Sequence, residues 1–302
     1  MRIIYPILAV ALLFTSCSKF QKTKSGMAYK ITKGGSSQKL KQGQIFKFNL
    51  EYKVSGKDTV LMSTYGHIPS YLIVDTSRFG RYNFTEIIPE CAPGDKVEFV
   101  LKIDSLIRMH MIPDYNNTFK KGGSIKGRVE ILAVFTDEKA ANEDYLKEIN
   151  SEKGREVADL KKYAKEKNIE VHDDDPTGVL YSIDNAGDGI KPDTSKVVTV
   201  IYTGYFTNGR VFDSNKDKPG AAPFKVMLGA HSVIPGWEEG LKHFAKGAKG
   251  KLLIPALLAY GPQGMPPVIG PFTNLIFDIE VTDVANKPAM PQAPAMEPNP
   301  VK

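Results

Sequence analysis

Few side chains of this 302-residue chain are arranged for nucleophilic or metal chemistry. The two cysteines belong to no metal-type cluster, and no redox pair or disulfide framework can be built from them. The run from His172 to Pro176 contains consecutive aspartates and suggests a metal site, but carboxylates before a proline more often form a turn. His231 and His243 lie in no His/Asp/Ser arrangement, so we interpret both as surface residues. We therefore expect no metal and no cofactor.

Three segments in the last third of the chain predict the elements of one mixed domain. Residues 197–203 form an apolar run typical of a buried strand, and residues 275–281 alternate between apolar and acidic positions. Residues 233–244 predict a helix with one apolar face, and Pro235 suits its first turn. We expect an antiparallel sheet covered by an amphipathic helix, which is the α+β class.

Aromatic residues are distributed along this domain. Any one of Trp237, Phe224 or Phe277 taken alone is best explained as core. However, they lie in stretches that follow one another in order: YTGYFTNGRVFDS, PFKVMLGAHSVIPGWEEGL, KGAKGKLLIP, AYG and NLIFDIEV. These stretches resemble the FKBP-type peptidyl-prolyl cis–trans isomerases over residues 178–284. The resemblance implies a curved antiparallel sheet wrapped around a short helix, and an enzyme that isomerises X–Pro bonds.

The resemblance also implies an aromatic pocket for a proline ring. Its floor would be Trp237, its polar members would lie at the edge, and the Ile234 N–H would donate to a bound carbonyl. The catalytic members would be Tyr202, Phe212, Asp213, Trp237, Tyr260 and Phe277, and the substrate-binding members Phe224, Val233, Ile234, Val268 and Ile269.

Some positions depart from the family pattern. Ser232, Leu258 and Met265 differ from the residue types usual in the family, and the segment between residues 213 and 224 is longer than in the minimal domain. These departures bear on macrolide affinity and sequence preference more than on catalysis.

Such a pocket needs no nucleophile. Rotation about an X–Pro bond has a barrier of about 18–20 kcal/mol because it breaks the C–N resonance. The twisted amide is less dipolar than the planar one, so an apolar, water-free site favours it. Acceleration by roughly 10⁴ requires about 5.5 kcal/mol of differential binding, which desolvation and one or two hydrogen bonds can supply. Tyr260 would hold the carbonyl before the proline, and Asp213 would orient donors.

The N-terminus predicts export and membrane anchoring. Arg2 precedes an apolar run over residues 3–14, which is too short to cross ~30 Å of hydrocarbon as a helix and is typical of a signal peptide. Small residues before Cys17 resemble a bacterial lipobox, which implies cleavage and lipidation there. The alternative is an ordinary secretory signal with an incidental cysteine. We expect an envelope lipoprotein facing the periplasm, with Cys91 as a buried, unpaired thiol.

Residues 26–136 predict a second, degenerate copy of the fold. Strand-like stretches at 45–53, 97–107 and 127–135 can be aligned with those of the later domain. The single tryptophan belongs to the later domain, so this copy lacks the floor and is predicted not to catalyse. Three more pocket residues are replaced in this copy: Tyr202 by Asn49, Phe212 by Leu61 and Asp213 by Met62.

The remaining segments complete the predicted organisation. Residues 137–168 predict two short helices that are interrupted at Gly154. We interpret them as a solvated connector in preference to a partner-binding helix. The domains are therefore a signal peptide (1–17), a tether (18–25), the degenerate copy (26–136), a helical connector (137–175), the isomerase domain (176–284) and a disordered Pro/Ala-rich tail (285–302).

The leading interpretation is an isomerase that acts on proline-containing polypeptides as they fold, with macrolides as candidate inhibitors. A client-binding chaperone with little isomerase activity is the alternative, and a purely structural lipoprotein is a weaker one. The net charge of +6 is spread along the chain, which disfavours nucleic acid as a partner. Apolar faces of the connector helices are compatible with a homodimer.

Overall fold

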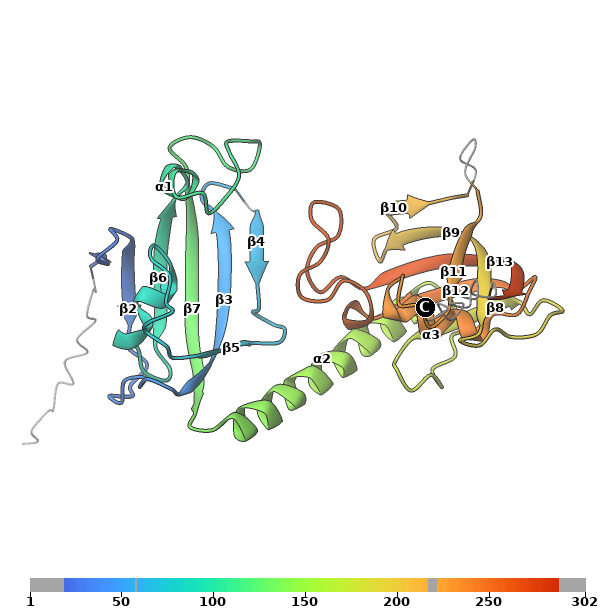
Figure 1. The fold of residues 1–302 in the computed structure, drawn as a ribbon, viewed down its shortest axis with the longest axis horizontal. Coiled ribbons are helices and arrows are strands. Elements are labelled where there is room, and N and C mark those ends of the chain that lie inside the picture. Colours follow the sequence, from blue (N-terminus) through green and yellow to red (C-terminus); the bar gives the residue numbers. More distant parts are fainter. Residues whose placement is uncertain (1–18, 58, 217–221, 288–302) are drawn as a thin grey trace, which may run out of the picture. The chain divides into compact units, whose positions relative to one another are not determined.

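The computed structural model describes residues 19–57, 59–216 and 222–287 (Figure 1). The described residues form two compact units, which divide between residues 143 and 144. The predicted signal peptide, Cys17 and nearly all of the predicted tail lie outside the described residues. Within the described ranges, no helix is both long and apolar enough to cross a membrane.

The first unit is built around an antiparallel sheet. Its strand order is β1-β2-β6-β7-β3-β4, and β5 also pairs with β3. One face of this sheet carries the apolar core, in which Phe46 and Phe99 are fully buried. The strands are β1 (Gln21–Lys22), β2 (Ala28–Thr32), β3 (Ile45–Val54), β4 (Val60–Ser63), β5 (Ser70–Ile73), β6 (Lys96–Lys102) and β7 (Ser124–Phe135), with short helices η1 (Phe84–Glu86), η2 (Ile88–Glu90) and α1 (Ile103–Arg108).

The second unit contains another antiparallel sheet, with the order β10-β9-β13-β12-β8 and with β11 paired to β9. The predicted alternation over residues 275–281 is confirmed, because Phe277 and Ile279 are buried in the core while Asp278 is exposed. The predicted helix over 233–244 is shorter, since a 3-10 turn follows its first six residues. The elements are β8 (Leu180–Asn185), β9 (Lys196–Phe206), β10 (Val211–Ser214), β11 (Phe224–Met227), α3 (Pro235–Gly240), η3 (Leu241–His243), β12 (Lys249–Ile254), η4 (Ala256–Leu258) and β13 (Leu275–Asn286).

The two sheets have the same connectivity. Strands β2, β6, β7, β3 and β4 of the first correspond to β8, β12, β13, β9 and β10 of the second, and β5 corresponds to β11. Both also contain an irregularity at the same place, where the pairing passes over Leu61 in β4 and Phe212 in β10. This agreement supports the predicted duplication of one α+β fold.

Helix α2 (Glu138–Glu166) is continuous over 29 residues, so the prediction of two short helices was wrong. Glycine costs a helix interior about 1 kcal/mol relative to alanine, and the strong helix formers around Gly154 outweigh that cost. The helix ends in a Schellman motif, in which Asn168 has a φ of 54°. The Ile169 N–H donates to the Ala164 carbonyl at 2.9 Å.

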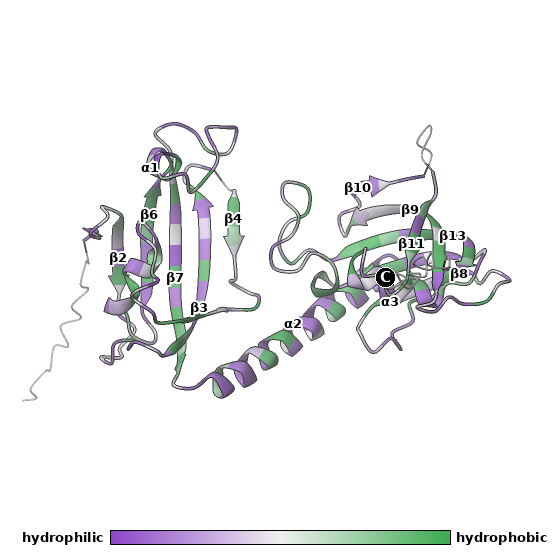
Figure 2. Ribbon diagram, in the orientation of Figure 1, coloured by the Kyte–Doolittle hydropathy of each residue, from purple (hydrophilic) through white to green (hydrophobic). Residues whose placement is uncertain are grey.

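The C-terminal half of α2 packs on the outer face of the second sheet. Leu160 and Ala164 are buried in a separate apolar cluster with Leu180, Leu253 and Ile276. Ile276 is on the opposite face of β13 from Phe277, because successive side chains of a strand alternate. This half of α2 is therefore no solvated connector: part of the sheet's outer face is apolar and must be covered. Figure 2 shows apolar positions recurring along the largely hydrophilic α2.

Two segments of the first unit differ from expectation. The stretch 97–107 is strand only as far as Lys102, because Ile103 and Leu106 have helical spacing and are buried as the apolar side of α1. The segment predicted as a tether, 18–25, contains β1, which pairs with β2.

The predicted surface position of His243 was wrong. Its Nε2 lies 2.8 Å from Oδ2 of Asp175, and its side chain is only 22% exposed. The ring stacks on Tyr181 with centroids 4.0 Å apart, and His172 stacks on the same tyrosine at 4.8 Å. Sequence spacing gave no signal for this contact, because Asp175 and His243 are 68 residues apart.

The aspartate run forms the predicted turn. The Gly178 N–H donates to the Asp175 carbonyl at 3.0 Å. Burial alone would raise the pKa of the Asp175 carboxyl, but hydrogen bonds from Thr177 and His243 outweigh it and lower that pKa. Asp174 accepts a hydrogen bond from the Tyr181 hydroxyl at 3.0 Å. These carboxylates therefore have structural partners.

Cys91 is fully buried in the core of the first unit, as expected. Burial raises the pKa of its thiol to about 12, and the nearby charge of Asp95 adds to the effect. Because the thiolate is the reactive form of cysteine, this residue is inert.

The packing of α2 predicts that Leu160→Ala lowers the free energy of unfolding by about 2–5 kcal/mol, the usual cost of removing a buried leucine. Leu146→Ala is the matched control, because Leu146 is on the same helix but 49% exposed, and it should stay within about 0.5 kcal/mol of the wild type. Urea unfolding followed by tryptophan fluorescence measures both, since the single tryptophan is in the second unit. Equal effects of the two variants would contradict this packing.

Candidate functional site

An aromatic cluster lies between α3 and the inner face of the second sheet. We define it as Tyr202, Phe212, Phe224, Trp237 and Phe277. Trp237 is at its centre, with ring centroids 5.0 Å from Tyr202, 5.2 Å from Phe277 and 6.1 Å from Phe224. All three contacts are edge-on, with interplanar angles of 89°, 84° and 72°, an arrangement that aromatic rings favour. Phe212 joins the cluster through Phe277, at 5.6 Å.

The strands place these rings through their register. Gly204 of β9 lies opposite Phe277 of β13. A β-carbon on Gly204 would come within 2.7 Å of Phe212 and 2.8 Å of Phe277, so only glycine lets both rings reach this position. The glycine of the YTGYF stretch is the sequence signal for this close approach.

A polar pair borders the cluster. The Tyr202 hydroxyl donates to Oδ2 of Asp213 at 2.6 Å. Burial raises the pKa of the Tyr202 phenol, and the hydrogen bond to Asp213 adds to the effect. The pKa of Tyr260 is also raised, by burial and then by the charge of Asp213. Both phenols are therefore neutral hydrogen-bond donors at physiological pH.

The start of α3 contributes two donors. Ile234 precedes the helix, and Pro235 takes its first position, as predicted. In the part of the chain that the structure describes, the Ile234 N–H has no hydrogen-bond acceptor. The indole Nε1 of Trp237 is buried and has no partner among the described residues. A buried donor without a partner is uncommon and requires an explanation, such as a ligand.

The connection between β12 and β13 carries the other predicted residues. Tyr260 packs against the same core as Val233 and Ile234, and Ile269 is fully buried there. Ile269 and Met265 exchange backbone hydrogen bonds of 3.0 and 2.8 Å, which closes a tight loop. Val268 is outside this core and 41% exposed. The structure thus brings most of the predicted set together and leaves Val268 at the surface.

Two supporting residues were missed by sequence reasoning. Phe206 packs on Phe212 at 5.0 Å and lies under the guanidinium of Arg210 at 4.5 Å. Asn215 accepts a hydrogen bond from the Tyr202 N–H at 2.7 Å and donates to the Val200 carbonyl at 3.0 Å. Its side chain replaces the ladder hydrogen bonds where β10 ends. This role could not be predicted from the sequence, because it depends on the register between β9 and β10.

The first unit lacks the equivalents of these rings. Its register matches that of the second sheet when Ile131 is aligned with Val281, each at the irregularity of its strand. Tyr202 then corresponds to Leu50, so the predicted correspondence with Asn49 was wrong by one residue. The positions of Leu61 and Met62 agree with the prediction.

The space of the missing rings is filled. Ser70 corresponds to Phe224, and Gly127 corresponds to Phe277. The Phe99 ring occupies this space, since a β-carbon on Gly127 would come within 2.0 Å of it. Phe99 of β6 in the first sheet therefore fills the space that Phe277 of β13 fills in the second.

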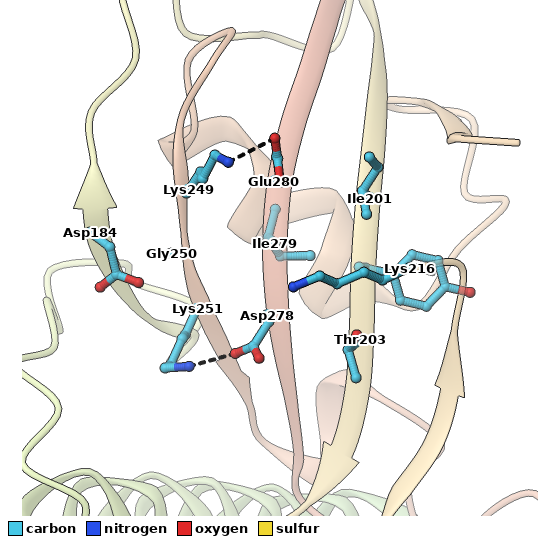
Figure 3. Close-up of a pocket in the computed structure, with 11 residues that line it drawn as sticks. Asp184, Ile201, Thr203, Lys216, Lys249, Gly250, Lys251, Asp278, Ile279 and Glu280 are labelled. Carbon is cyan, nitrogen blue, oxygen red and sulfur yellow. Dashed lines mark hydrogen bonds and ion pairs between the residues drawn. The ribbon is translucent and has the colours of Figure 1, made fainter. Parts of the chain in front are cut away.

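A separate groove lies on the outer face of the second sheet (Figure 3). Its walls are charged, and two ion pairs cross it: Lys249 with Glu280 at 2.9 Å and Lys251 with Asp278 at 2.5 Å. Lys216 extends over it from the opposite side. This groove is lined mainly by charged side chains, so it does not have the chemistry to take a proline ring.

Comparisons with known proteins agree with the geometry. A model described as FKBP-type peptidyl-prolyl cis-trans isomerase matches residues 189–282. The isomerase FkpA of Escherichia coli is 40% identical over 149 residues, which are 48% of this chain and 52% of that protein. Outer membrane protein MIP of Legionella longbeachae is 43% identical over 109 residues, 36% of this chain and 45% of the relative.

A shorter relative is covered almost completely. FK506-binding protein 1 of Saccharomyces cerevisiae is 42% identical over 99 residues, which are 32% of this chain and 85% of that protein. In contrast, the chain spans about half the length of its FkpA relatives. With the aromatic cluster, its register and these similarities together, the chain belongs to the FKBP-type peptidyl-prolyl cis-trans isomerase family.

Proposed function

We propose that this protein isomerises X–Pro bonds of polypeptides and that the aromatic cluster is its active site. The observation that carries the proposal is the group of edge-on rings around Trp237, bordered by the hydroxyl of Tyr202 and the unpaired N–H of Ile234. The apolar floor suits a proline ring, and the donors at one edge suit the peptide carbonyls on either side of that ring.

The chemistry follows from where the polar groups are. Rings exclude water from the amide, and the twisted amide is less dipolar than the planar one, so the site lowers the barrier by binding the twisted form better. The Ile234 N–H would hold one substrate carbonyl, and the Tyr260 hydroxyl would hold the carbonyl before the proline. Asp213 fixes the Tyr202 ring through their hydrogen bond. No proton transfer is required.

The cellular setting is part of the same proposal. The lipobox-like sequence at Cys17 and the similarity to an outer membrane protein support an envelope protein anchored by a lipid. Its substrates would be proline-containing polypeptides exposed while they fold. Macrolides that bind FK506-binding relatives are candidate inhibitors, because the rings around Trp237 are present.

The first unit would not catalyse. Phe99 occupies the space over Gly127, and Ser70 and Leu50 provide no aromatic walls. All isomerase activity of the chain would then come from the second unit.

Phe224→Ser tests the cluster without damaging the core, because Phe224 is 44% exposed and serine is its counterpart in the first unit. We expect kcat/KM for a proline peptide to fall about tenfold, since an aromatic contact of about 1.5 kcal/mol is lost, with the melting temperature unchanged. Phe20→Ser, at a 53% exposed position of the first unit, is the control. A protease-free assay on residues 18–302 provides the measurement. Full activity of Phe224→Ser would refute the assignment of this ring.

The raised phenol pKa values predict a flat pH profile. Both Tyr202 and Tyr260 have pKa values above the ordinary 10.0, so both remain protonated donors as the pH rises from about 7 to about 9. We expect kcat/KM to vary by less than about twofold over this range. A sigmoidal loss with its midpoint inside the range would show that a titrating group takes part and would contradict the mechanism.

The anchor is tested by Cys17→Ser in the full chain expressed in a bacterium that lipidates proteins. We expect the wild type to incorporate labelled fatty acid and to sediment with membranes, and the variant to do neither. Incorporation that survives the substitution would exclude Cys17 as the lipidated residue.

A further inference from the structure

We propose that Glu156 of helix α2 is a positioning residue for the loop that carries Tyr260. Its side chain caps η4 from outside the isomerase fold and so holds the backbone that leads to the site. The inference rests on the proposed function, because Tyr260 has a catalytic role only if the cluster is the active site.

Helix η4 has no cap of its own. Pro255 is its N-cap residue, and proline offers neither an N–H nor a side-chain oxygen. Two distant residues satisfy the first N–H groups instead. The Leu257 N–H donates to Oε2 of Glu156 at 3.0 Å, and the Ala256 N–H donates to Oδ1 of Asn274 at 2.8 Å.

The same two residues are linked to each other. Nδ2 of Asn274 donates to the Glu156 carbonyl at 3.4 Å. Helix α2, the start of η4 and the start of β13 thus meet in one hydrogen-bonded group. Since residues 156, 257 and 274 all lie in the second unit, this group belongs to one compact body.

Tyr260 depends on η4 through short backbone bonds. The Ala256 carbonyl accepts from the Ala259 N–H at 2.9 Å and from the Gly261 N–H at 2.8 Å, on either side of Tyr260. The Gly261 carbonyl then accepts from the Phe272 N–H at 2.9 Å. A shift of η4 therefore moves Tyr260 relative to Trp237.

Burying the carboxylate of Glu156 costs free energy that a residue used only for packing would not cost. It is 3% exposed and lies on the same face of α2 as Leu160 and Ala164. Its Oε1 has no partner among the described residues, and burial raises the pKa of its carboxyl. An aliphatic side chain would cover the sheet without this penalty. The carboxylate adds what an aliphatic residue cannot, a hydrogen bond to the loop.

The capping residue lies outside the part of the chain that the family model matches. The family match begins at residue 189, well after the end of α2. The cap is thus supplied by a segment outside the matched domain, and an isomerase fragment that begins after α2 would lose it.

The test compares variants of the chain from residue 18 onward by two readouts. One is kcat/KM for a proline peptide, and the other is amide hydrogen exchange over residues 255–272. We expect Glu156→Ala to lower kcat/KM about fivefold to tenfold, as for loss of one hydrogen bond, and to speed exchange at Leu257. Glu156→Gln should retain both properties, because its amide oxygen still accepts from Leu257. Glu166→Ala, at an exposed position of the same helix, is the control and should change neither.

A double-mutant comparison separates positioning from general destabilisation. In a Tyr260→Phe background, Glu156→Ala should cause little further loss, since the group that it positions has been removed. Unchanged kcat/KM in Glu156→Ala, or an equal loss in both backgrounds, would overturn the proposal. If Glu156→Ala does not fold, Glu156→Leu, which keeps the packing volume, takes its place. If the wild type is inactive, the proposed function fails. The exchange rate at Leu257 then still decides whether Glu156 holds the backbone of η4.

Discussion

The pairing of β9 with β13 is the constraint on which the second unit depends. Its register places Gly204 opposite Phe277 and Tyr202 opposite Ile279. A slip of β13 by one residue would turn its side chains to the other face of the sheet. The Phe277 ring would then face away from Trp237. Since the pairing extends to Lys196 and Asn286, a long ladder fixes this register.

The sheet is covered on both faces, and the two coverings have different consequences. Helix α3 closes the inner face and supplies Trp237, which is 4% exposed. Helix α2 covers only the apolar part of the outer face, and the charged groove occupies the rest (Figure 3). This division explains why Leu253 and Ile276 are apolar although Lys251 and Asp278, two residues away on the same face, are charged. Helix α2 is thus part of the packing of the second unit.

The two units share one sheet connectivity and differ in the side chains that the sheets carry. Their strand order and their irregularities agree, so the backbone alone does not distinguish them. The side-chain differences include the exchange of Phe277 and Leu252 for Gly127 and Phe99 and the loss of the tryptophan. In the second sheet the large ring is in β13 and contacts Trp237. In the first it is in β6, where it packs on Phe84 and fills the space.

Much of the second unit was predictable from local sequence. Alternation over residues 275–281 and the helical spacing from Ile234 to Phe244 gave the two faces of the core, and the resemblance gave the ring set. The contacts that were missed are tertiary ones. Glu156 to Leu257 and His243 to Asp175 join residues 101 and 68 positions apart, and neither pair has a local pattern. Gly154 predicts a break in α2, but the helix formers around it outweigh its cost. The position that corresponds to Tyr202 was predicted one residue too early, because a strand irregularity cannot be located without its partner strand.

The most direct measurement is a nuclear Overhauser spectrum of the chain with an X–Pro peptide present, with the indole of the single tryptophan protonated in a deuterated background. We predict cross-peaks between the proline ring and the indole protons of Trp237, together with exchange peaks that link the cis and trans peptide. Accelerated exchange without any contact to this indole would place catalysis elsewhere and would refute the aromatic cluster as the active site.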